Sequence, residues 1–192
     1  MAVLDPERAD VDSVLVTRWT ADDPDAAVVE ALAGAKPEGL VAAAGYAGFD
    51  GTSVLLYEQW RGTPTERREG AVEYRWYRGA TRPDPPEVGC VVIVTAEFDG
   101  VVDPRTWVDA VLDALAADDS PAPGGISAHF HVSADGTRAL NLAGWTSEAA
   151  HVAALEASGQ GTVGLGEKWR AVKEFPGTTG GGFTRFRLVR EV

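Results

Sequence analysis

Residues 37–60 read PEGLVAAAGYAGFDGTSVLLYEQW, and residues 123–145 read PGGISAHFHVSADGTRALNLAGW. A shift of 85 positions superposes Asp50-Gly51-Thr52 on Asp135-Gly136-Thr137 and Trp60 on Trp145. Asp-Gly between two β-like runs is a strong hairpin signal, because glycine adopts the positive φ of the turn at little steric cost. Each stretch is therefore predicted to form two antiparallel strands, the second of which ends at a tryptophan.

The segments that precede the two hairpins also correspond. β-Branched runs predict strands at 13–17 and 90–95. After each run, an acidic residue followed by proline predicts the start of a helix, at Asp23-Pro24 and at Asp103-Pro104. Both halves are therefore expected to begin with a strand, a helix and a hairpin.

The two halves differ after the hairpin. Residues 146–155 predict a capped, alanine-rich helix and 167–172 a further short helical turn, whereas RGTPTERREG at 61–70 is too broken for a comparable helix. Each half closes on a predicted strand, at 71–77 and 183–189. The order β-α-β-β-α-β of the second half is that of a ferredoxin-like unit, and the first half is the same unit with its second helix reduced.

We therefore predict an α+β fold made of two ferredoxin-like repeats, at residues 13–80 and 88–190, with a proline-rich linker at 79–86. Each antiparallel sheet carries its helices on one face, so the other face must be covered. Packing the two sheets face to face, as an intramolecular dimeric α+β barrel, covers both. A ligand cavity is expected inside the barrel or between a sheet and its helices.

Composition limits the classes of partner. The chain of 192 residues is 45% hydrophobic and 24% charged, which is ordinary globular usage. Its net charge of -12 disfavours nucleic acid and membrane surfaces as partners. A single cysteine, Cys90, excludes an internal disulfide and a Cys-rich zinc site, and its apolar surroundings predict a buried thiol. The acidic start MAVLDPERADVD does not resemble a signal peptide, so a cytoplasmic location is expected.

The segment Asn141-Leu-Ala-Gly-Trp145-Thr-Ser-Glu-Ala-Ala-His151 resembles the antibiotic biosynthesis monooxygenase family of the dimeric α+β barrel superfamily, here in tandem-fused form. The resemblance implies a cofactor-independent monooxygenase, with neither metal nor flavin, that oxidises an aromatic polyketide-type phenol or anthrone to a quinone with molecular oxygen. The family's asparagine and strand-end tryptophan match Asn141 and Trp145, and its tyrosine falls on His151. Because Leu56 stands at the asparagine position of the first repeat, the second repeat is expected to bear the site.

The chemistry of these side chains fits such a reaction. The Asn141 amide can hydrogen-bond a developing enolate oxygen, Trp145 offers an aromatic surface and a donor, and His151 can accept a proton near neutral pH. Structural roles stay open beside these: tryptophans pack in cores, an asparagine satisfies a backbone group, and a helical histidine lies at a surface. Three further aromatic residues are expected as cavity walls: Tyr57, Trp60 and Trp76.

His129 and His131 are alternate residues of a predicted strand, so their side chains share a face about 7 Å apart. With His151 they form the one three-histidine set that the sequence allows, but no Asp or Glu stands beside them on the strand. We predict no metal site and assign both histidines to the lining of the substrate cavity, with ordinary strand positions as the alternative.

Other functions stay open at this stage. One is a non-oxidative tailoring enzyme, a cyclase or isomerase; another is a non-catalytic protein that binds aromatic ligands. No P-loop, dinucleotide-binding glycine motif or nucleophile elbow occurs in the sequence. The expected partners are a small aromatic substrate and molecular oxygen. Whether the chain assembles further into a homo-oligomer is not determined by its sequence.

Overall fold

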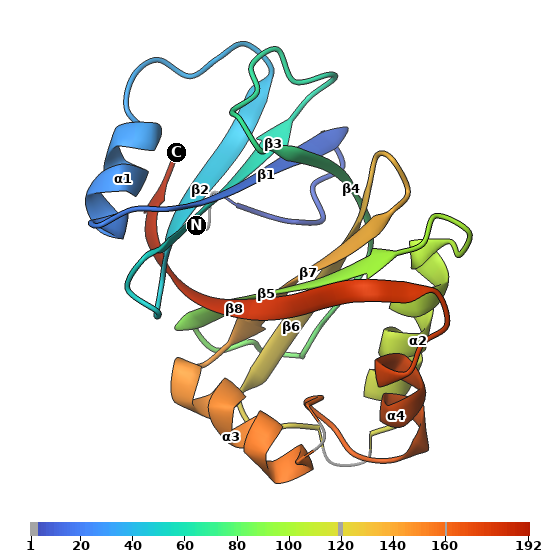
Figure 1. Cartoon of the computed structure of the whole chain (residues 1–192). Coiled ribbons are helices and arrows are strands. Elements are labelled where there is room, and N and C mark those ends of the chain that lie inside the picture. Colours follow the sequence, from blue (N-terminus) through green and yellow to red (C-terminus); the bar gives the residue numbers. More distant parts are fainter. Residues whose placement is uncertain (1–3, 119–120, 160) are drawn as a thin grey trace. The chain divides into compact units, whose positions relative to one another are not determined.

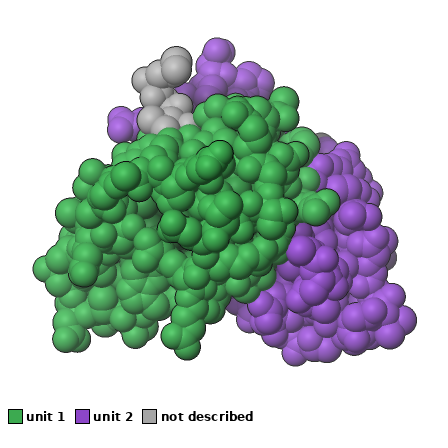
Figure 2. Space-filling view, turned by 90° about the horizontal axis from the view of Figure 1, so that it is seen from above, with its two compact units in different colours: residues 1–76, 184–192 green, residues 77–183 purple. Residues whose placement is uncertain are grey.

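The computed structural model describes residues 4–118, 121–159 and 161–192 (Figure 1). The chain divides into two compact units (Figure 2). Unit 1 consists of residues 1–76 and 184–192, and unit 2 consists of residues 77–183. Two long strands, β4 (Val72–Thr81) and β8 (Thr178–Glu191), each begin in one unit and end in the other.

Unit 1 is an antiparallel sheet with one helix on it. Its strands lie in the order β4-β1-β3-β2-β8. α1 packs on β2 and β3 (Figure 1), and the Asp23 side chain caps its first turn by accepting from the Ala26 N–H at 3.0 Å. The elements complete within this unit are β1 (Ser13–Thr20), α1 (Pro24–Ala31), β2 (Leu40–Gly48) and β3 (Ser53–Trp60).

Unit 2 has the strand order β8-β5-β7-β6-β4 and carries three helices in its described residues. α2 and α4 lie side by side (Figure 1). Its elements are β5 (Cys90–Phe98), α2 (Pro104–Ala116), β6 (Gly125–Ser133), β7 (Arg138–Trp145), α3 (Glu148–Ser158) and α4 (Glu167–Lys173). The antiparallel α+β class predicted from the sequence is confirmed.

Both predicted hairpins are confirmed, and they have the same register. Leu40 pairs with Trp60 in the first and Gly125 with Trp145 in the second. Each hairpin also has a shift in register directly after that pair, before Ala42 and before Ser127. The turn glycines, Gly51 and Gly136, have φ of 80° and 69°, as the Asp-Gly signal requires.

The expected difference after the hairpins is also present. No helix forms over 61–71, whereas α3 and α4 follow the second hairpin. β4 continues to Thr81, into the segment predicted as a linker. The repeat boundaries 13–80 and 88–190 and the face-to-face packing of the two sheets stay predictions. Among the described residues, no helix is long and apolar enough to span a membrane.

Each unit has its own apolar core. In unit 1, Val28 and Leu32 of α1 pack on Ala43, Val54 and Leu56 of the sheet. In unit 2, one cluster joins α2 and α4 to the sheet, and a second places Cys90, Trp145 and Ala154 of α3 together. The predicted burial of the Cys90 thiol is confirmed.

The close packing of α1 on the sheet depends on Gly45 in β2. A Cβ atom there would lie 2.3 Å from Cγ1 of Val28 and 3.1 Å from Cδ1 of Leu32. We expect Gly45→Ala to lower the free energy of unfolding by about 1–3 kcal/mol through overpacking, as measured by urea denaturation. Gly182→Ala is the control, since no atom lies within 4 Å of its Cβ position. Equal effects of the two substitutions would contradict this account.

Candidate functional site

Trp145 and His151 meet in unit 2. The Ser147 side chain accepts from the Ala150 N–H at 3.1 Å and starts α3 directly after β7, which turns His151 of the first helical turn back onto the strand end. The His151 ring lies edge-on to Trp145, with ring centroids 4.9 Å apart, and edge-on to Phe183 at 5.2 Å. His151 and Trp145 are buried, and Phe183 is 45% exposed. The structure therefore brings two of the three predicted catalytic residues together.

Asn141 lies apart from this pair. It is opposite Phe130 on β6, in the region of the sheet that α2 covers, and four residues or about 13 Å along β7 from Trp145. Its Oδ1 accepts a hydrogen bond from the His129 backbone N–H at 3.0 Å. The structural role left open for this asparagine, the pairing of a backbone group, is the one that its oxygen performs here.

The surroundings of Trp145 are tightly packed. Its indole shares an apolar cluster with Cys90, Val92, Ala143 and Ala154, and Ala150 packs against the cluster from α3. The small side chain of Ala143 is itself buried in this cluster.

His129 and His131 lie on the other face of the sheet. They pair with Leu142 and Leu140 of β7, whereas Asn141 pairs with Phe130, and residues paired directly across strands share a face. His129 and His131 thus do not converge with His151. In the described part of the chain, no group of three or more His, Cys, Asp or Glu side chains is arranged to hold a metal ion.

The three predicted wall residues have different surroundings. Tyr57 is fully buried in β3, and its burial, with Tyr46 close by, raises the pKa of its hydroxyl. Trp76 on β4 is 43% exposed. Trp60 is buried at the end of β3, and it alone of the three lines the pocket described next.

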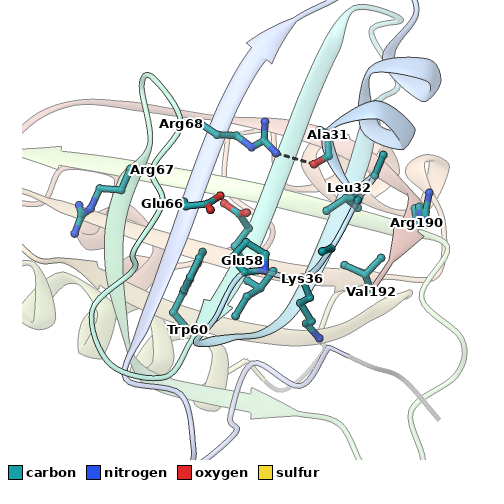
Figure 3. A pocket seen from close by; sticks show the side chains of 15 residues that line it. Ala31, Leu32, Lys36, Glu58, Trp60, Glu66, Arg67, Arg68, Arg190 and Val192 are labelled. Carbon is teal, nitrogen blue, oxygen red and sulfur yellow. Dashed lines mark hydrogen bonds between the residues drawn. The ribbon is translucent and has the colours of Figure 1, made fainter.

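A pocket of about 300 Å³ opens in unit 1, between the end of α1, β3 and the segment 61–71 (Figure 3). This volume is at the lower end of the range typical of small-molecule sites. Its lining combines the apolar end of α1 with the tryptophan and several charged side chains: Ala31–Pro37, Leu40, Glu58, Trp60, Glu66, Arg67, Arg68, Arg190 and Val192.

Two side chains of β3 form the buried wall of this pocket. Glu58 and Trp60 are alternate residues of the strand and share its helix-facing side. Glu58 is only 8% exposed. Nε1 of Trp60 is buried and has no hydrogen-bond partner among the described residues.

The charged side chains opposite come from the segment 61–71. Arg68 donates from Nη2 to the Ala31 carbonyl oxygen at 2.6 Å, which ties the segment to the last turn of α1 (Figure 3). Burial raises the pKa of the Glu58 carboxyl, the charge of Arg68 lowers it, and the charge of Glu66 raises it. Glu58 and Glu66 extend toward one another in Figure 3.

The sequence-based prediction of a site in the second repeat stays a prediction, and it did not consider Glu58 of the first. The available signal was a carboxylate inside the apolar strand SVLLYEQW, at the position of Ala143 in the second hairpin. The difference after the hairpins changes what lies beside the two tryptophans. In unit 2, α3 covers the strand-end tryptophan, whereas in unit 1 the segment 61–71 leaves a pocket beside Trp60.

No family model and no curated protein matches this sequence. Solved structures do match. An anthrone oxidase-like protein is 16% identical with a TM-score of 0.72, over 98% of this chain and 95% of that one. A ferredoxin-fold protein related to antibiotic biosynthesis monooxygenases, from Listeria monocytogenes, is 15% identical with a TM-score of 0.56, over 93% and 96%. A heme-degrading enzyme from Listeria monocytogenes is 13% identical with a TM-score of 0.54, over 91% and 98%. The chain thus has the fold of monooxygenase-like proteins.

The buried carboxyl of Glu58 has a pH signature in stability. Because its pKa is raised in the folded state, its favourable contribution is present below the unfolded-state pKa and is lost as the pH rises through the folded-state pKa. We expect the stability of Glu58→Gln, compared with that of the wild type, to be higher at pH 7 than at pH 4. Thermal unfolding of both proteins at the two pH values measures this difference. A difference that does not change with pH would contradict the burial of a charged carboxylate.

His131 is expected to change the pH dependence of stability in the opposite direction to Glu58. It is fully buried, its Nδ1 donates to the His129 carbonyl oxygen at 3.1 Å, and burial lowers its pKa from 6.5 to about 3. Since the unfolded chain then binds more protons, the wild type loses stability as the pH falls from 6.5 toward 3. Urea denaturation across this range is expected to show a shallower pH dependence for His131→Gln than for the wild type; parallel curves would refute the assignment.

Proposed function

We propose that the chain is a cofactor-independent monooxygenase that oxidises an aromatic, polyketide-type phenol or anthrone in secondary-metabolite biosynthesis, with the substrate bound in the pocket of unit 1. The fold alone does not specify a reaction, since related folds carry different chemistries. The observation that carries the proposal is the Trp60 indole, with its buried and unpartnered N–H, on the wall of a pocket that also holds the buried carboxyl of Glu58. Likeness to an anthrone oxidase-like protein supports the choice of substrate class.

The reaction balances without a further reductant. An anthrone methylene loses two hydrogens, one oxygen atom of O₂ becomes the new carbonyl, and the other leaves as water. The substrate must first be deprotonated, and the resulting anion needs hydrogen-bond donors in a site away from water. The indole of Trp60 would supply an aromatic surface for the fused rings and a donor for the oxygen that acquires charge.

A second location for the same chemistry is the predicted set in unit 2, with Trp145 and Asn141 binding the substrate and His151 as base. The edge-on contact of His151 with Trp145 supports it, as does the exposed Phe183 ring beside His151. Substrate entry there requires displacement of the apolar cluster around Trp145. The pocket of unit 1 requires no such opening.

The proposal includes the tandem arrangement of two ferredoxin-like repeats. The two hairpins have matching registers, including the shift that follows the pairs Leu40–Trp60 and Gly125–Trp145. Two repeats that once bore equivalent sites can diverge, so that one keeps a full set of helices and the other keeps space for a ligand.

Oxygen uptake with 1,8-dihydroxyanthrone, without added flavin and with excess chelator, tests the function. We expect turnover by the wild type, a fall in kcat/KM of about 100-fold in Trp60→Phe because a transition-state donor is lost, and little change in the matched Trp145→Phe. The reverse pattern would assign the reaction to unit 2. Consumption of the anthrone under anaerobic conditions would replace the oxygenase with a non-oxidative enzyme, and binding without turnover would replace it with a ligand-binding protein.

A further inference from the structure

We propose that Glu58 takes the phenolic proton of the substrate in the pocket of unit 1, and that the neighbouring Glu66 tunes it. This inference rests on the proposed function of that pocket. Neither residue matches the asparagine, tryptophan and histidine set that the sequence motif indicates.

Position is the first element. Glu58 and Trp60 lie on the same side of β3, about 7 Å apart along the strand. A phenol whose ring contacts the indole therefore reaches the carboxyl with its hydroxyl group. Glu58 is almost fully buried, yet it lines the pocket, so the carboxyl faces a ligand rather than bulk solvent.

Charge is the second element. Glu66 and Arg68, both on the segment 61–71, act on Glu58 with opposite sign. Lys36 and Arg190 complete the charged lining, from the segment before β2 and from β8. Lys36 donates to the Val41 carbonyl oxygen at 2.7 Å. Arg67, the remaining cation of the pocket, pairs with Glu73.

The proton-transfer step balances without any further reactant. The phenolic O–H bond breaks, an O–H bond forms on the Glu58 carboxylate, and the electron pair stays on the phenolate, which O₂ then oxidises. An ordinary carboxylate is a weak base toward a phenol. Burial, the largest cause, raises the pKa of Glu58, the charge of Arg68 lowers it, and the charge of Glu66 raises it. The net effect is a raised pKa, closer to that of the group it must deprotonate. Glu66 is exposed.

The pH profile of kcat/KM is the first test, on the full chain with 1,8-dihydroxyanthrone. Glu58 must be ionised to act, so activity is expected to fall on the acid side as its carboxylate is protonated. Glu58→Gln should lose at least 100-fold in kcat/KM, the usual range for a general base. Glu66→Gln should remain active with its acid limb moved to lower pH, because the repelling charge on Glu58 is removed. Glu69→Gln, in the same segment but outside the pocket lining, is the matched control with an unchanged profile.

Anaerobic binding is the second test, and it separates this inference from the proposed function. In the wild type, bound 1,8-dihydroxyanthrone is expected to show the absorption of its anion at a pH where the unbound compound is neutral, and Glu58→Gln should bind it without that band. If the wild type shows the anion but consumes no oxygen, the oxygenase fails and the role of Glu58 stands. If Glu58→Gln, shown to be folded by circular dichroism, keeps the anion band or the wild-type pH profile, the role of Glu58 is refuted.

Discussion

Among its described residues, unit 1 has a single short helix to cover the helix-facing side of its sheet, and the rest of the unit depends on how this is done. α1 reaches the strands closely because Gly45 has no side chain, and it buries Val28 and Leu32 on Ala43, Val54 and Leu56. A helix of this length covers only part of the sheet. What remains beside it is enclosed by the segment 61–71, which is irregular and rich in charge, so the enclosed space is a pocket and not a core.

Unit 2 covers the helix-facing side of its sheet in a different way. Three helices cover that sheet, and α3 places small and aromatic side chains directly on the strand-end tryptophan. The residues that match the monooxygenase motif are thus involved in packing and in backbone pairing. Asn141, for example, accepts a hydrogen bond from the His129 backbone N–H. The residues of this motif and the pocket beside Trp60 thus lie in different units.

Much of the fold could be predicted from the sequence because its signals are local. The Asp-Gly turns, the Asp-Pro helix starts and the alternating strands each depend on a few neighbouring residues, and hairpins, caps and element order follow from them. The pocket could not be predicted, because it depends on what is absent over Trp60 and on side chains brought together from α1, β3 and the segment 61–71. Glu58 was visible as an isolated carboxylate in an apolar strand, but its burial and its charged neighbours are tertiary properties. The opposite faces of Asn141 and His131 follow from alternation, whereas the contact of His151 with Trp145 required the turn at Ser147.

The hydrogen bond from Arg68 to the Ala31 carbonyl oxygen fastens the rim of the pocket to the helix, while its floor belongs to β3. Rim and floor are therefore carried by different parts of the chain. Insertions or charge changes in the irregular rim alter the entrance without disturbing the strand pairing that positions the floor. Such a division lets selection remodel the entrance while the strand pairing beneath it is preserved, a freedom that a helix-covered surface does not offer.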